Sequence, residues 1–300
     1  FTVNGGSNGD VGLNKMRRSY ERAMDNGTPM VQLLEGVGHR ISEGLDSRLF
    51  APGFDVLGLQ AQMSGWVPTP TAMLGQGFAA MTLIASMSDF VVLVRNLSFM
   101  GIAPPALVKA AVGEDVDAEQ LGGAEIQAHR NGVADYVVDT EIDALDTIKK
   151  YLTYFPANSS HPPPVVKSLP ADPEFAERLP TVVPTNMRYP YDVRHVIKGI
   201  IDRDSLLEIK PGYARNMVCG LTRIGGRSVG IVANQPNFLA GSIDSPACDK
   251  ASHFVSLCDA FGISLLFMLD LPGFIAGTEA ERSKLARRSS KLIYENAQTT

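Results

Sequence analysis

A glycine-rich stretch in the N-terminal half has residue types that could stabilise a negatively charged oxygen. The stretch, 75–80 (GQGFAA), leads into a predicted helix of small residues. The first N–H groups of a helix have no partner inside the helix, so they can donate hydrogen bonds to an oxyanion that develops during a reaction. Small side chains would also let a carbonyl group approach the backbone. Tight packing of the helix on a sheet explains these residues equally well, and both interpretations stay open.

Two further glycine loops each follow a short apolar run. The loop 35–44 (EGVGHRISEG) places Arg40 among glycines, where a guanidinium could bind a phosphate or carboxylate. Pairing of Arg40 with Glu43, three residues on, is the simpler interpretation, and we prefer it. The loop 270–278 (DLPGFIAGT) is its counterpart in an internal repeat described below. Ligand sites of α/β proteins usually lie at such carboxyl ends of strands.

Other common kinds of site have little support. The five histidines are scattered and lack the spacing of metal ligands, so no metal is expected. The sequence contains neither a G-x-S-x-G nucleophile motif nor a Walker loop. The stretch 5–9 (GGSNG) lacks the Lys-Ser/Thr of a phosphate-binding loop, and we interpret it as a wide turn.

Composition indicates a globular α/β protein with a weak negative charge. The 300 residues are 45% hydrophobic and 20% charged, which favours a packed core over disorder. A formal net charge of −5 argues against a nucleic-acid partner. The most apolar run, 263–271, contains Asp270 and is too short to span a membrane. Three cysteines outside any CxxC motif favour buried thiols and a reducing compartment.

Apolar periodicity predicts the elements that carry the loops. A strand over 69–77 is expected to run into the glycine loop at its end, and two strands joined at Gly225-Gly226 are expected to form a hairpin. The other predicted helices are 15–25, 78–88, 118–128, 141–152, 194–201 and 250–260, and the other predicted strands are 30–34, 90–94, 134–138, 217–224, 228–233 and 265–269.

Proline content suggests where the chain divides. Nine of its 19 prolines lie between Pro156 and Pro190, a stretch that we interpret as an extended surface linker. We therefore predict an N-terminal domain over 1–155, a linker over 156–190 and a C-terminal domain over 191–300.

The two predicted domains resemble each other. A shift of 235 residues places Lys15 on Lys250, Gly27 on Gly262 and Gly38 on Gly273, and aligns the apolar runs 30–34 and 265–269. Each copy reads as an amphipathic helix, a glycine turn, a buried strand and a glycine loop. On this alignment the first copy lacks the counterparts of 191–233 and the second lacks those of 66–155, so we expect the chain to be part of a longer duplicated protein.

At these loops the sequence resembles the carboxyltransferase (beta) subunits of biotin-dependent acyl-CoA carboxylases, in particular the propionyl-CoA and acetyl-CoA branch. The matching stretches are 1–15 (FTVNGGSNGDVGLNK), 105–138 (PALVKAAVGEDVDAEQLGGAEIQAHRNGVADYVV), 229–241 (VGIVANQPNFLAG) and 253–279 (HFVSLCDAFGISLLFMLDLPGFIAGTE). The resemblance implies tandem crotonase-like α/β domains built from repeated ββα units. It covers nearly the whole chain.

The resemblance also implies a reaction, in which CO2 passes from N1-carboxybiotin to the α-carbon of a short-chain acyl-CoA through a thioester enolate. Biotin would arrive on a carrier protein or domain, and no metal is implied in this subunit. Such chemistry needs two oxyanion sites and no side-chain base, in keeping with the absence of a paired histidine or carboxylate. The implied partners are the biotin carboxyl carrier, the biotin carboxylase subunit and further copies of the chain, as a dimer within a hexamer. No nucleic acid or membrane is implied, and the expected compartment is the cytoplasm or the mitochondrial matrix.

Site residues follow by motif. The enolate hole falls at Ala79 and Ala80, where the family commonly has Gly-Gly; a positive φ would be costly for alanine. The second hole is expected beyond residue 300. The residues implied for acyl-CoA are Gly36, Gly38, Arg40, Gly75 and Gly77, and those implied for biotin are Pro272, Gly273, Phe274 and Gly277.

Two other functions stay open at this point. A transcarboxylase or a decarboxylase subunit of the same fold would share the half-reaction, and a non-catalytic scaffold would retain the fold without the chemistry. The sequence selects neither the acyl chain nor the direction of transfer.

Overall fold

The computed structural model describes residues 2–51, 53–186 and 188–299. The chain forms two compact units. The first contains the residues up to 152 together with 157–160, and the second contains 153–156 together with the residues from 161 onwards.

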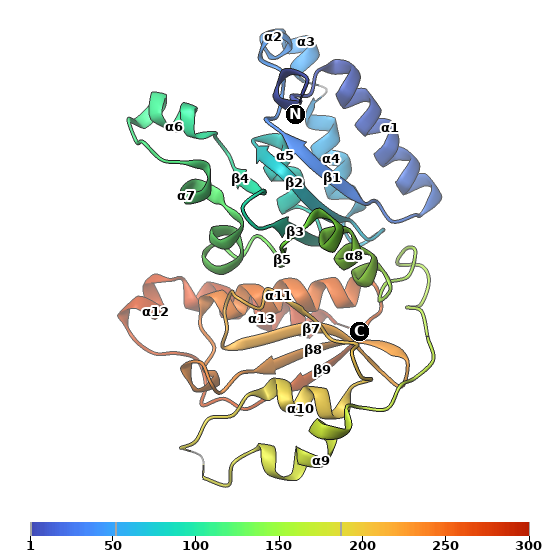
Figure 1. Cartoon of the computed structure of the whole chain (residues 1–300), viewed down its shortest axis with the longest axis vertical. Coiled ribbons are helices and arrows are strands. Elements are labelled where there is room, and N and C mark those ends of the chain that lie inside the picture. Colours follow the sequence, from blue (N-terminus) through green and yellow to red (C-terminus); the bar gives the residue numbers. More distant parts are fainter. Residues whose placement is uncertain (1, 52, 187, 300) are drawn as a thin grey trace. The chain divides into compact units, whose positions relative to one another are not determined.

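The first unit is built on a parallel sheet (Figure 1). Its strands follow the order β1-β2-β3-β5, and β4 also pairs with β2. The helix α5 packs on β1 and β2, α4 contacts both α1 and α5, and α8 packs on β2, β3 and β5. In chain order its elements are η1 (Asn4–Gly6), α1 (Asp10–Asn26), β1 (Gln32–Gly36), α2 (Ile41–Gly44), α3 (Ser47–Phe50), α4 (Gly53–Met63), β2 (Pro70–Phe78), α5 (Ala80–Ser86), β3 (Phe90–Val94), β4 (Phe99–Gly101), α6 (Pro105–Val112), α7 (Ala118–Gly122), the π-helix η2 (Ile126–Arg130), β5 (Tyr136–Val138) and α8 (Glu141–Leu152).

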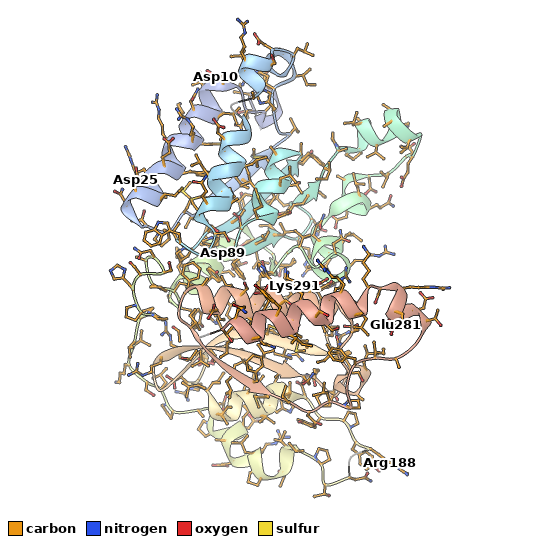
Figure 2. The ribbon with its side chains drawn as sticks, turned by 180° about the vertical axis from the view of Figure 1, so that it is seen from behind. Asp10, Asp25, Asp89, Arg188, Glu281 and Lys291 are labelled. Atoms are coloured by element: carbon orange, nitrogen blue, oxygen red, sulfur yellow. The ribbon has the colours of Figure 1, made fainter. Side chains whose placement is uncertain are left out.

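Local sequence explains the main elements of this unit. β3 is buried along its whole length, as expected for an apolar strand inside a parallel sheet. α1, whose two ends are marked by Asp10 and Asp25 in Figure 2, stops at Gly27 in a left-handed conformation that glycine adopts at low cost. The predicted helix over 118–128 is instead α7 followed by η2, because the backbone at Gly123 is extended.

The glycines expected in a loop after 69–77 lie within β2, which extends to Phe78. Gly77 pairs with Gly36 of β1. A Cβ at Gly75 would come within 2.5 Å of the Glu35 side chain, so this glycine makes room for a neighbouring strand's side chain. The loop interpretation of Gly75 and Gly77 is therefore wrong, and the turn is confined to the residues after Phe78.

The second unit is built on a mixed sheet of order β6-β7-β8-β9, in which only β8 and β9 are parallel. The predicted hairpin is confirmed: β7 and β8 pair on either side of Gly225 and Gly226, whose φ values are +61° and +76°. Its elements are α9 (Pro173–Val182), α10 (Val193–Ile200), β6 (Leu207–Ile209), β7 (Met217–Ile224), β8 (Arg227–Asn234), η3 (Leu239–Gly241), α11 (Ser245–Ala260), β9 (Ser264–Met268), α12 (Thr278–Arg282) and α13 (Leu285–Gln298).

The proline-rich stretch is not extended throughout. Pro173–Val182 forms α9, because Asp172 caps the helix and Pro173 occupies its first turn, where a missing N–H does no harm. Upstream of α9, the Asp202 carboxylate accepts from the N–H groups of Leu169 and Gly226, at 3.2 and 2.9 Å. The segment before α9 is thereby fastened to the β7–β8 turn.

The structure confirms the internal duplication residue by residue. η1 and η3, 235 residues apart, are both single turns with positive φ at every position. In the first unit Asn8 pairs with His39 as an isolated parallel bridge, and in the second Ile243 pairs with Phe274 at the same shift. The Asn8 N–H donates to Gly38 O at 2.7 Å, and the Ile243 N–H donates to Gly273 O at 3.0 Å.

Candidate active site

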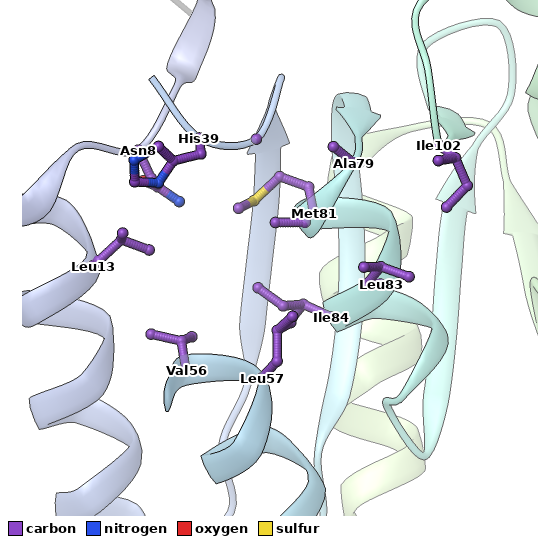
Figure 3. A pocket seen from close by; sticks show the side chains of 12 residues that line it. Asn8, Leu13, His39, Val56, Leu57, Ala79, Met81, Leu83, Ile84 and Ile102 are labelled. Atoms are coloured by element: carbon purple, nitrogen blue, oxygen red, sulfur yellow. The ribbon is translucent and has the colours of Figure 1, made fainter. Parts of the chain in front are cut away.

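An apolar cavity of about 250 Å³ lies in the first unit where β1 and β2 end (Figure 3). Gly38, Ala79 and Ala80 line it, so the structure brings together three residues that the sequence placed on two different loops. His39 and Ala79 lie at one end of the cavity, and Val56 and Leu57 of α4 lie towards the other. The remaining walls come from α1, from α5 and from Ile102.

Ala79 forms the entrance to α5 with a strained backbone. Its φ of 51° and ψ of −118° belong to a region that L-residues rarely adopt and that glycine adopts freely. Its N–H is already in use, because it donates to Gly101 O at 3.0 Å. The expectation that both Ala79 and Ala80 supply free donors is therefore wrong for Ala79.

Ala80 is the first helical residue of α5. Within the part of the chain that the structure describes, no acceptor takes its N–H. An N–H in the first turn of a helix points along the helix dipole away from the helix body, where negative charge is favoured. Ala80 is thus the donor available to a ligand oxygen in the cavity.

Thr82 and Gly101 hold this arrangement in place. The Thr82 hydroxyl lies 2.8 Å from Gly77 O and 2.9 Å from Gly101 O, and it accepts from the Gly101 N–H at 3.0 Å. Sequence reasoning missed both residues. Their role depends on the pairing of β4 with β2, which brings together positions more than 20 residues apart and leaves no local pattern.

Arg40 lies outside the cavity wall and is engaged with its own loop. Its guanidinium contacts Glu43 at 2.8 Å, which is the pairing that the spacing favoured, and lies 3.3 Å from Ser7 O. Glu43 in turn accepts from the Asp10 N–H at the start of α1, at 2.6 Å. This backbone hydrogen bond, with help from Arg40, lowers the pKa of the Glu43 carboxyl.

Gly36 is a packing glycine. Its φ is +151°, and a Cβ there would come within 2.5 Å of Gly6 O. Gly36, Gly75 and Gly77 are absent from the cavity wall, so Gly38 alone among the predicted acyl-CoA glycines lines it. Its φ of +90° and its closeness to Ala79 explain why glycine is needed there.

The loop after β9 presents its predicted ligand residues on the surface of the second unit. Pro272, Phe274 and Gly277 are exposed, and Phe274 retains 49% of its accessible surface. Gly273 and Gly277 have φ values of +137° and +133°, with no atom within 4 Å of an added Cβ. Gly273 and Phe274 occupy the positions that Gly38 and His39 occupy in the first unit.

Other sources of chemistry are limited in the described residues. Over 2–51, 53–186 and 188–299, no group of three His, Cys, Asp or Glu side chains is placed to hold a metal ion. All three cysteines are buried, and burial raises the pKa of Cys219 to about 12 and that of Cys248 to about 11, which keeps both as thiols. In the same ranges no helix is long and apolar enough to cross a membrane.

Comparisons with known proteins agree on one family. The carboxyl transferase domain profile matches residues 1–300. The chain is 37% identical over its whole length to a propionyl-CoA carboxylase carboxyltransferase subunit of Haloferax mediterranei, of which it covers 58%. It is 36% identical to the biotin-dependent acetyl-/propionyl-coenzyme A carboxylase beta5 subunit of Mycobacterium tuberculosis, of which it covers 55%.

Solved structures give the same result. A transcarboxylase 12S crystal structure with bound methylmalonyl-coenzyme A superimposes on the whole chain with a TM-score of 0.93 at 35% identity, and the chain covers 57% of it. A single-chain long-chain acyl-CoA carboxylase superimposes with a TM-score of 0.87 at 31% identity. The chain spans somewhat more than half the length of the curated relatives that it matches. With its crotonase-like α/β fold and full-length match, the chain belongs to the carboxyl transferase domain family.

Proposed function

We propose that the chain forms the carboxyltransferase part of a biotin-dependent acyl-CoA carboxylase, which moves CO2 from N1-carboxybiotin to the α-carbon of a short-chain acyl-CoA. The family and the names of its relatives support the reaction. The observation that carries its location is the N–H of Ala80, which begins α5 at the wall of an apolar cavity and has no acceptor among the described residues.

Ala80 acts on the acyl-CoA. Loss of a proton from the α-carbon puts negative charge on the thioester oxygen, and the Ala80 N–H donates to that oxygen. A preorganised donor of this kind lowers the barrier by about 3 kcal/mol. Ala79 contributes its conformation rather than its N–H, because its φ turns the chain so that Ala80 faces the cavity.

The loop glycines and Arg40 shape the acyl-CoA side. Gly38 borders the cavity and lets the thioester approach the backbone. Gly36, Gly75 and Gly77 hold β1 and β2 close together, and Arg40 fixes the loop to α1 through Glu43. In this proposal these four residues act through the loop's position.

The loop 272–277 would hold biotin, which supplies CO2 from its carboxylated ring. The residues present fit a flat, largely apolar ring: Pro272 and Phe274 are exposed, and Gly273 has open space beside its Cα. The duplication supports this assignment, because Gly273 and Phe274 repeat the positions of Gly38 and His39 beside the first cavity.

Assembly follows from the same relationship. The transcarboxylase 12S structure is described as a hexamer and a multienzyme core. We extend this to the present chain, as a dimer within a hexamer that receives a biotin carboxyl carrier and works beside a biotin carboxylase subunit.

A second candidate is transcarboxylase activity, which the superposition on transcarboxylase 12S favours. The two candidates share the half-reaction at Ala80 and differ in whether ATP-driven carboxylation or a keto acid supplies the carboxyl group.

The test is decarboxylation of malonyl-CoA and methylmalonyl-CoA with free biotin, in the protein that carries this chain. Free biotin removes the need for a carrier. Turnover that depends on biotin is expected, and the faster thioester ranks the acyl chain. A folded protein that binds CoA thioesters without turnover would contradict the proposal and favour a scaffold. Exchange with a keto acid in the absence of ATP would select the transcarboxylase.

A further inference from the structure

We propose that the cavity beside Ala80 receives the acyl chain itself and selects linear chains of about six to eight carbons over propionyl. This inference rests on the proposed function, since it concerns the thioester that Ala80 binds. It differs from the substrate of the propionyl-CoA carboxylase relatives.

The inner end of the cavity is closed and apolar. Val56, Ile84 and Met81 retain 1%, 2% and 4% of their accessible surface, so they form fixed walls. Figure 3 shows Val56, Leu57 and Ile84 together at the end away from His39 and Ala79. A chain whose thioester oxygen meets the Ala80 N–H would therefore extend towards these three side chains.

The outer end is open. Leu83 and Ile102 line the cavity but retain 42% and 66% of their accessible surface. The polar lining side chains, Asn8 and His39, lie at the opposite end from Val56 and Leu57 (Figure 3). The coenzyme would leave by this outer end, where its polar arm can reach water.

The size of the cavity exceeds what a propionyl group needs. One water-sized group takes roughly 30 Å³, so a volume of about 250 Å³ holds roughly eight such groups. Propionyl has only two carbons beyond its carbonyl. An apolar space left dry and empty around them would lose the contacts that a longer chain makes.

The pantetheine arm of CoA is a poor occupant of the inner end. Its two amides would have to leave water, which is costly without hydrogen-bond partners. Val56, Leu57 and Ile84 offer no polar side-chain atoms, whereas a hydrocarbon chain gains from burial among them.

The experiment measures kcat/KM for propionyl-, butyryl-, hexanoyl- and octanoyl-CoA in the reconstituted carboxylase. Each buried methylene should raise kcat/KM about fourfold, giving roughly a 50-fold preference for hexanoyl over propionyl. Binding of the same thioesters is measured by calorimetry without biotin, so the inference is tested even where turnover fails.

Val56→Phe fills the inner end and should remove most of the preference for hexanoyl-CoA. Val56→Leu is the milder variant if the first does not fold. Val67→Leu is the matched control, because Val67 is equally buried in the same core but lies outside the cavity wall. It should leave the ratio of the two substrates unchanged.

The outcomes separate this inference from the proposed function. Propionyl-CoA turning over faster than hexanoyl-CoA would overturn the inference and leave the function standing. Tighter binding of hexanoyl-CoA without any carboxylation would support the inference and overturn the function. A failure of all four thioesters to bind would overturn both.

Discussion

The methyl group of Ala79 lies against Gly38: a Cβ built on Gly38 would come within 2.9 Å of it. Both residues have positive φ, +51° at Ala79 and +90° at Gly38, so both positions favour glycine. Only one of them has it. The mouth of the cavity is therefore built from a relaxed glycine and a strained alanine in contact.

Replacing Ala79 with glycine should stabilise the protein by about 1 kcal/mol. Backbone strain of about 1–3 kcal/mol is relieved, and the greater freedom of glycine in the unfolded chain offsets part of the gain. Urea unfolding of the first unit measures the change. Ala80→Gly is the control, because Ala80 is helical and should lose stability instead. Equal effects of the two variants would contradict the strain at Ala79.

Ala80→Pro removes the N–H that we assign to the enolate. Proline is tolerated at the first position of a helix, so α5 should still form, and circular dichroism checks this. We expect kcat to fall by about 100-fold, in line with the loss of one preorganised donor. Ala80→Gly keeps the N–H and should keep most of the rate. Unchanged turnover in a folded Ala80→Pro protein would place the oxyanion site elsewhere.

Lys250 should be essential to the second unit, although its duplicate Lys15 is dispensable. The Lys250 ammonium is 2% exposed and donates to the carbonyls of Lys210, Tyr213 and Met217 at 2.8, 2.9 and 2.7 Å. Burial lowers its pKa to about 8, which leaves it charged at pH 7. Lys250→Met strands three carbonyls and should cost about 3–5 kcal/mol.

Lys15→Met provides the comparison for this prediction. Lys15 is exposed on α1 at the position equivalent to Lys250, so its loss should change the free energy of unfolding by less than about 0.5 kcal/mol. Guanidinium unfolding at pH 7 measures both variants. Similar losses in the two would show that the carbonyl contacts of Lys250 contribute little.

Asp89 should make the first unit less stable as pH rises. Burial raises the pKa of its carboxyl to about 6, although the Thr69 N–H donates to it at 2.8 Å and pulls the other way. Because the folded pKa lies above the unfolded one, the folded state holds the proton more tightly. Stability from this group is present below about pH 4 and is lost as pH passes through about 6.

Asp89→Asn should remove this pH dependence. The asparagine oxygen can still accept from Thr69, and no charge is buried. The variant should therefore gain stability over the natural protein as pH rises from 4 to 7, by on the order of 3 kcal/mol at most. Urea unfolding across this range measures the difference. A difference that stays constant with pH would contradict the buried charge.

Local pattern was enough to predict much of the fold. β3, α8 and β7 have the predicted bounds, because each is a simple apolar run or an amphipathic period closed by turn residues. The duplication was also visible, since glycines with positive φ recur at a fixed shift. α9 was missed because proline content outweighed the Asp172 cap.

The candidate site was less accessible to sequence reasoning. Nothing near Ala79 shows that its N–H is taken by Gly101, since that contact follows from strand pairing. Arg40 in contrast was correctly paired with Glu43, which lies within one helical turn. Local partners can be predicted from spacing, and distant ones require the fold.

The last prediction concerns the loop proposed for biotin. Gly273→Val is a poor probe, because the φ of +137° strains any side chain there even though the space is open. Phe274→Ala avoids this strain, since Phe274 is half exposed and folding depends little on it. Losing an apolar wall should raise KM for free biotin by about tenfold with little change in the free energy of unfolding. Leu269→Ala is the control, because Leu269 is 72% exposed and precedes the loop. Biotin-dependent decarboxylation measures KM in both variants, and equal values would remove Phe274 from the site.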